Sequence, residues 1–141
     1  MAKITKPLPM IVPWTKPYWE AAKRHELLLL RCIDCGQYRH PMAAGESFMC
    51  PNCTSTKQPQ WAKVSGRAKV MTWTAVHRVY HPGFADETPY VVVIVLLEEG
   101  ARMIANLRGI KFEAIKANMD VEVCFEELSD EITLPQFRPK A

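Results

Sequence analysis

Cys32-Ile33-Asp34-Cys35 and Cys50-Pro51-Asn52-Cys53 are two Cys-x-x-Cys pairs separated by fourteen residues. Each pair forms a tight turn with two sulfurs on one side of the backbone, so two facing pairs offer four thiolates in the tetrahedral arrangement that Zn²⁺ prefers. Gly36 follows the first pair, where such a turn often needs a positive φ. Pro51 stiffens the second turn. The doubled spacing predicts a structural zinc ribbon in which these four cysteines are the metal ligands.

Two other uses of the paired cysteines remain open from the sequence, namely two disulfides or a redox-active dithiol, although a redox motif needs one pair and not two. A fifth cysteine, Cys124, lies alone in an apolar run. The odd count, the zinc motif and the lack of a recognisable signal peptide predict a reducing, cytoplasmic location. No apolar run approaches about 18 residues, so no membrane-spanning segment is expected.

Charge is distributed unevenly along the chain. Residues 1–81 hold twelve Lys and Arg against four Asp and Glu, whereas residues 82–141 hold six against eleven. An anionic partner would therefore meet the first half of the chain. Ordinary solvation of two separate surfaces is the alternative explanation.

The N-terminal region combines proline with large apolar and aromatic side chains. Residues 1–13 contain three prolines, which favour an extended arm lying on another surface over a helix. A short helix is predicted over about residues 14–26. It carries Trp14, Tyr18 and Trp19, and aromatic residues at this density either pack in a core or contact a partner or ligand.

Short strands are predicted around the cysteines. The leucine-rich run at residues 27–31 leads into the first pair, and residues 37–41 and 46–49 lie between the pairs. Four sulfurs already complete the metal site, so His40 is expected on the surface and not as a ligand.

From residue 60 the apolar pattern changes to an alternation with a period of two, which predicts strands. The second of these strands is longer than usual and must bend or bulge, as strands do when a sheet closes on itself. Residues 109–118 read as a loop or one helical turn before the last strand. The pattern predicts a mostly β fold, with an N-terminal helix and a Cys₄ zinc ribbon followed by a five-stranded OB-fold barrel, and a β-sandwich as the alternative. The predicted strands are residues 61–64, 67–80, 90–97, 101–107 and 121–126.

The chain divides into three predicted parts. Residues 1–26 form the extended arm and short helix, residues 27–59 the zinc ribbon, and residues 60–141 the barrel. The C-terminal residues 134–139 contain two prolines and are predicted to be a tail outside the sheet.

An ordered set of motifs covers the chain from about Trp14 to Pro139. Together these motifs resemble the acyl-CoA-associated OB-fold proteins that carry an N-terminal rubredoxin-like zinc ribbon, the DUF35 type. The motifs are Tyr18–Ala22, Cys32–Gly36, Cys50–Cys53, Trp61, Ser65–Arg67, Thr74–Arg78, Pro89–Val92, Gly109 and Pro135–Pro139.

The resemblance implies an accessory role beside a larger enzyme. The chain is similar to the small subunits of two-component thiolases, of which benzoylsuccinyl-CoA thiolase is one example. The resemblance implies a thiolase-fold large subunit that supplies the catalytic groups, a CoA thioester at the shared interface, and a hetero-oligomer. Structural Zn²⁺ held by four thiolates is the expected cofactor.

The residues themselves favour a non-catalytic chain. Cys124 lies mid-strand between apolar neighbours, without a base in sequence reach, and is expected to be inert. His77 and His81 flank Arg78, but no paired carboxylate accompanies them. We expect CoA phosphates to meet basic residues around the ribbon, and aromatic and basic residues elsewhere to contact the partner or the substrate edge. The CoA candidates are Lys23, Arg24, Arg31, Arg39 and Lys57; the contact candidates are Trp14, Tyr18, Trp19, His77, Arg78, His81, Phe137 and Arg138.

Other functions stay open from the sequence. The chain could serve an acyl-CoA hydratase or another CoA enzyme, or hold two enzymes together without touching substrate. Single-stranded nucleic-acid binding is a further alternative, because OB barrels stack bases on aromatic residues. The acidic second half argues against it, since a single-strand groove carries positive charge.

Overall fold

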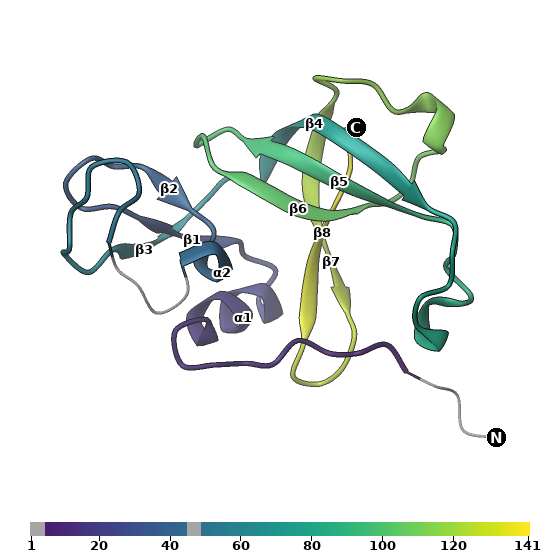
Figure 1. The fold of residues 1–141 in the computed structure, drawn as a ribbon, viewed down its shortest axis with the longest axis horizontal. Helices are drawn as coiled ribbons and strands as arrows, with labels where there is room; N and C mark the ends of the chain where they lie inside the picture. Colours follow the sequence, from purple (N-terminus) through teal and green to yellow (C-terminus); the bar gives the residue numbers. More distant parts are fainter. Residues whose placement is uncertain (1–4, 45–48) are drawn as a thin grey trace.

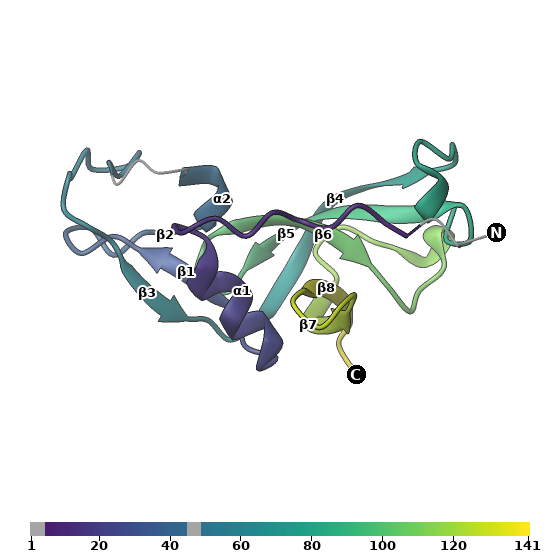
Figure 2. The ribbon, with the colours of Figure 1, turned by 90° about the horizontal axis from the view of Figure 1, so that it is seen from below.

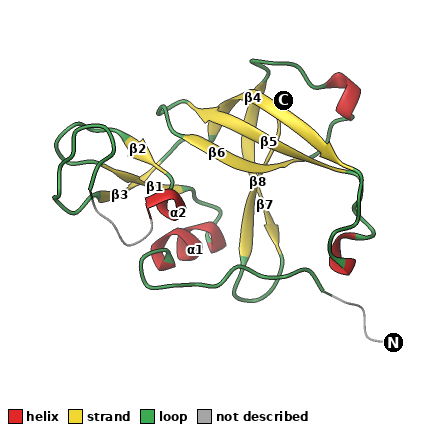
Figure 3. Ribbon diagram, in the orientation of Figure 1, coloured by secondary structure: helices red, strands yellow, loops and turns green. Residues whose placement is uncertain are grey.

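Two β-sheets follow one another along the chain, with one α-helix packed where they meet (Figures 1 and 3). The computed structural model describes residues 5–44 and 49–141; the strand predicted at 46–49 therefore lies, except for Met49, outside the described residues. The elements are α1 (Lys16–Lys23), β1 (Leu28–Arg31), β2 (Tyr38–Arg39), α2 (Pro41–Ala44), β3 (Gln60–Lys63), β4 (Arg67–Val76), β5 (Tyr90–Leu97), β6 (Arg102–Leu107), β7 (Asp120–Glu127) and β8 (Thr133–Pro139), with 3₁₀ turns η1 (Pro82–Phe84) and η2 (Phe112–Ala114).

The first sheet contains β1, β2 and β3, in the order β2-β1-β3. The strand predicted at 61–64 is real, but its assignment to the barrel was wrong. It pairs antiparallel with β1, and Trp61 lies opposite Leu30. Period-two alternation predicts that a segment is a strand and says nothing about its partner, because both sheets offer an apolar face.

The second sheet is a closed five-stranded barrel in the order β4-β5-β6-β8-β7, which confirms the predicted OB-type architecture. Its fifth strand is β8, formed by the proline-containing segment that was wrongly predicted to be a tail. β8 pairs with β7 along its whole length. The Phe137 carbonyl accepts a hydrogen bond from the Arg108 N–H, so odd-numbered residues of β8 direct their backbone away from β7. Pro135 and Pro139 therefore remove no bond from the β7 ladder, as expected for prolines on a nearly free edge.

Strand β4 contains the bulge that the sequence predicts. Its register against β5 shifts between Val70 and Thr72, and the strand ends at Val76 and not at Tyr80. Val70 points inward before the bulge, whereas Trp73 packs against the core after it. The inward and outward faces of this strand therefore change over after Val70, because a bulge exchanges the two faces.

One apolar core joins the helix, the first sheet and the barrel. Tyr18 and Trp19 of α1 are 2% and 3% exposed and belong to the same buried cluster as Leu29 of β1 and Val93 of β5. Of the two roles considered for these aromatic residues, core packing is the one found. The helix thus links the first sheet to the barrel by burial of large aromatic side chains.

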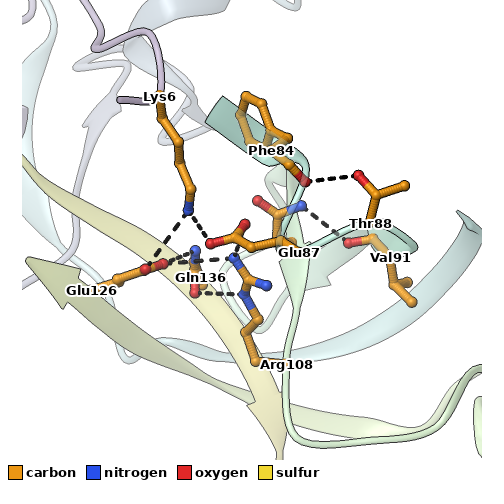
Figure 4. A network of polar contacts seen from close by, with 9 residues as sticks. Lys6, Phe84, Glu87, Thr88, Val91, Arg108, Glu126 and Gln136 are labelled. Atoms are coloured by element: carbon orange, nitrogen blue, oxygen red, sulfur yellow. Dashed lines mark hydrogen bonds and ion pairs between the residues drawn. The ribbon is translucent and has the colours of Figure 1, made fainter. Parts of the chain in front are cut away.

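The described part of the N-terminal arm, residues 5–13, lies on its own chain and reaches the barrel, as Figure 2 shows from below. Lys6 forms an ion pair with Glu87 and lies 3.8 Å from a Glu126 oxygen, and Arg108 reaches the same two carboxylates at 3.3 and 3.6 Å (Figure 4). Burial alone raises the pKa of Glu87, but hydrogen bonds from Lys6 and Arg108 outweigh it and hold that pKa below its ordinary value. Four charges of balanced sign therefore hold the arm beside the β4–β5 loop, where it packs against the backbone of Gly83.

Two glycines with positive φ provide a matched test of packing between the two sheets. Gly66 (φ 78°) and Gly100 (φ 96°) both occupy left-handed conformations, but a Cβ on Gly66 would lie 2.3 Å from Val123 Cγ1, whereas one on Gly100 meets nothing within 4 Å. We expect Gly100→Ala to cost about 1 kcal/mol from backbone strain alone. Gly66→Ala should cost about 2 kcal/mol more, because the barrel strand must move. Urea unfolding followed by tryptophan fluorescence measures both, and equal losses would contradict the packing described.

Candidate metal centre

The four paired cysteines converge on one point between two turns. All four Sγ atoms lie within 4.8 Å of one another, and the Cys32–Cys53 and Cys35–Cys50 pairs are each separated by 3.7 Å. Four sulfurs around a zinc ion at about 2.3 Å would be separated by about 3.8 Å in a tetrahedron. A disulfide needs about 2.05 Å, so the four are free thiols and not two disulfides. The residues fit structural Zn²⁺.

Both turns have the same backbone pattern, which explains their sulfur geometry. In the first turn, the Cys32 N–H donates to the Gln37 carbonyl and the Gly36 N–H donates to the Cys32 carbonyl. In the second turn, the Cys50 N–H donates to the Ser55 carbonyl and the Thr54 N–H donates to the Cys50 carbonyl. Gly36 has φ 73°, as predicted from the sequence, and Thr54 takes the same conformation with φ 60°. The repeated turn directs two sulfurs from each pair toward the common centre.

Polar contacts tie the two turns together and favour ionised sulfur at Cys35, whereas at Cys53 a backbone hydrogen bond from Ser55 is outweighed by burial and the neighbouring cysteines, which raise the pKa of the Cys53 thiol. A side-chain hydrogen bond from Asn52, followed by the Gln37 N–H, lowers the pKa of the Cys35 thiol to about 6. Asp34 accepts hydrogen bonds from Lys57 (2.7 Å) and Ser55 (2.5 Å), which lower the pKa of its carboxyl group. A centre with four protein ligands holds structure and leaves no position for a reacting water.

The five predicted CoA contacts do not form one cluster. Arg39 lies opposite Leu30 in the first sheet and Arg31 lies opposite Tyr38, so the two arginines point to opposite faces. Lys57 is held by Asp34, and Arg24 lies 3.6 Å from Glu26.

Two of the five cations have no ion pair within residues 5–44 and 49–141. Arg31 is exposed, and its guanidinium lies 5.7 Å from the centre of the Tyr38 ring. Lys23 is exposed at the end of α1. Both are open to an anionic ligand.

The predicted partner contacts divide by burial. Tyr18, Trp19 and Phe137 are at most 3% exposed and belong to the chain's own core, so they offer little surface to a partner. The other five candidates remain predictions. Trp14 and His81 are half-buried, His77 and Arg78 are exposed, and Arg138 is exposed beside Glu122 at 3.1 Å.

His40 is not the surface residue that was expected. Its ring is half-buried and lies 3.3 Å from the Tyr18 hydroxyl, and burial lowers its pKa to about 4. It does not belong to the four-sulfur group, as predicted. Cys124 is half-buried in β7, and burial raises the pKa of its thiol, which agrees with an unreactive cysteine.

Sequence reasoning missed a groove of about 300 Å³ beside β6. A signal was available, because Ile104 occupies an outward position between Arg102 and Asn106 and is 69% exposed. An apolar residue at a solvent position of an alternating strand marks an unpartnered surface. The groove is lined by Tyr18, Trp19, His40, Met42, Val92, Met103, Ile104, Ala105, Asn106, Leu134 and Pro135.

Removing the metal tests the centre directly. We expect the purified chain to contain one zinc ion, and Cys50→Ser to lose it, because a ligand and a buried sulfur disappear together. Cys124→Ser is the matched control and should retain the metal. Amide spectra of the zinc-free chain should lose the dispersed signals of residues 28–63 and keep those of the barrel strands. Zinc bound normally by Cys50→Ser, or lost from Cys124→Ser, would contradict this assignment.

Among the described residues, no helix combines the length and apolar composition that crossing a bilayer requires.

Residues 61–126 match the family model for the ChsH2 C-terminal OB-fold domain, and residues 19–44 match that for the ChsH2 rubredoxin-like zinc ribbon domain.

Known proteins resemble the chain over most of its length. It is 37% identical over 97% of its length to a protein of Thermomonospora curvata named "Probable enoyl-CoA hydratase alpha subunit", of which it spans 41%. It is 33% identical over 80% of its length to a DUF35 domain-containing scaffold protein of Methanocaldococcus jannaschii, of which it spans 77%. A solved chain of the Ltp2-ChsH2(DUF35) aldolase superposes with a TM-score of 0.79 at 37% identity, covering 94% of this chain and 98% of that one. The chain therefore belongs to the DUF35 family, with a ChsH2-type zinc ribbon and OB-fold.

Proposed function

We propose that this chain is a non-catalytic accessory subunit of an acyl-CoA acyltransferase complex of the thiolase type. The thiolase-fold partner supplies the catalytic groups, and a CoA thioester binds at the shared interface. The observation that carries the proposal is the apolar core that joins a four-cysteine ribbon to an OB barrel. Because of this core, the ribbon and the barrel can offer their surfaces to a partner enzyme in a fixed arrangement.

The chemistry of the side chains supports an accessory role. Burial raises the pKa of the Cys124 thiol, and within the described residues the structure shows no base hydrogen-bonded to it. A four-thiolate centre offers no Lewis acid. Catalytic groups are therefore assigned to the partner enzyme. This chain helps to bind and orient the CoA thioester and to shield it from water.

The relatives support assembly with a CoA enzyme. One is named as an alpha subunit of an enoyl-CoA hydratase, another as a scaffold, and the superposed chain comes from an aldolase described with two components. The choice of a thiolase-type partner comes from the sequence resemblance. A hydratase partner is the second candidate, favoured by the 37% identity to the protein of that name.

Within this proposal, Arg31 and Lys23 are assigned to CoA phosphates. Both are exposed and lack an ion pair in the described chain, and a guanidinium can hold a phosphate through two parallel hydrogen bonds. Arg24 and Lys57 already face Glu26 and Asp34, so a phosphate would have to displace a carboxylate. Arg39 remains a candidate on the opposite face of the first sheet.

Reconstitution tests the proposed function. The large subunit is assayed for CoA-dependent thiolysis with and without this chain, and for hydration of an enoyl-CoA under the same conditions. We expect thiolysis to require the chain. Hydration that requires the chain would select the hydratase alternative, and activities indifferent to the chain would overturn both.

A charge-matched pair tests the CoA contact. Arg31→Gln should raise the KM for the CoA substrate about fivefold with little change in kcat, since about 1 kcal/mol of ground-state binding is lost. Arg67→Gln is the control, because Arg67 is also exposed but paired with Glu98 at 2.7 Å on the barrel. Equal KM values for the two variants would remove Arg31 from the site.

A further inference from the structure

The barrel is closed between β6 and β8 by a single residue pair. β6 pairs with β5 from Arg102 to Leu107, but with β8 only at Leu107, opposite Phe137. Figures 1 and 2 show β6 diverging from β8 toward its start. In the described chain, no strand pairs with residues 102–106 of β6 on this side.

Hydrogen-bond directions show which backbone groups face the opening. The Leu97 N–H donates to the Ala101 carbonyl, so these opposite residues form a hydrogen-bonded pair. Antiparallel pairs alternate, and Met103 and Ala105 therefore also bond to β5. The N–H groups of Arg102, Ile104 and Asn106 point the other way, toward the opening. The next in that series, the Arg108 N–H, already donates to Phe137.

The open edge forms one side of the 300 Å³ groove. Ile104 at its centre is 69% exposed, and Met42 of α2 beside it is 46% exposed. The groove is also lined by His40 and Met42, and by Leu134 and Pro135 of β8. The groove is therefore a strand edge with apolar walls.

We propose that an extended segment of the partner enzyme adds to β6 as a further strand, an inference that rests on the proposed function. Unpaired N–H groups repeating every second residue recognise another extended backbone, and apolar walls recognise its alternate side chains. The groove of about 300 Å³ is small, which favours a single extended segment over the edge of a second barrel, because that edge is backed by its own sheet. Arg102 is exposed without an ion pair in the described chain, so the segment carries a carboxylate near that end.

Amide exchange in the intact complex tests the proposal. The tagged, ¹⁵N-labelled chain is compared alone and in the complex with the acyl-CoA enzyme that co-purifies with it from its source cells. The Ile104 and Asn106 amides should exchange rapidly in the free chain and at least about tenfold more slowly in the complex. The Met103 and Ala105 amides should be protected in both.

Proline at position 104 gives a second test. Ile104→Pro removes an outward N–H and the branched side chain but no N–H that bonds to β5, so it should leave the Met103 and Ala105 amides protected while weakening the complex at least about tenfold. Ile104→Val keeps the N–H and the branched side chain, and should bind like the parent.

Each outcome separates the inference from the function beneath it. A stable complex with unprotected Ile104 and Asn106 amides would overturn the strand addition and leave the accessory role intact. Absence of any complex would overturn both. Protection that grows with the concentration of the chain alone would assign the edge to a second copy and overturn the partner segment.

Discussion

Four cysteine sulfurs that lie within 4.8 Å of one another can all be ionised only with a cation among them. Like charges at such distances repel strongly in a partly buried site, so without the metal most of the four would hold their protons. The two turns that carry the sulfurs belong to a sheet with only four, two and four residues in its strands. A sheet of this size buries too little surface to persist alone, and the metal makes it a fixed element.

The position of the zinc ribbon relative to the barrel is fixed by the short link at residues 64–66 and by the packing of α1 in the common core. The Val64 N–H donates to the Leu27 carbonyl, and only Ser65 and Gly66 intervene before β4 begins. The Ser65 N–H is held by Glu99 at 2.7 Å, and the Gly66 carbonyl accepts from Val123. With Tyr18 and Trp19 of α1 buried in the common core, the ribbon cannot swing freely on its link. The consequence for function is a defined spacing between the exposed Arg31 on the ribbon and the open edge of β6.

Much of this architecture was predictable because local patterns carry it. The doubled Cys-x-x-Cys spacing predicted the metal centre, and alternation predicted most strands, including the bulge in β4. Pairing was not predictable in the same way: β3 reads like a barrel strand but bonds to β1. β8 was missed because proline was read as a break, although its prolines face a nearly unpaired side. Burial was not predictable at single positions either, since Phe137 is aromatic and flanked by polar residues yet lies inside the barrel.

Native mass spectrometry of the tagged chain isolated from its source cells tests most directly whether it is a zinc-holding accessory subunit. We expect an assembly that contains this chain, one zinc ion for each copy of it, and an acyl-CoA enzyme subunit, and that releases bound CoA thioester on activation. The chain found alone, without zinc, or bound to nucleic acid in place of an enzyme would contradict it.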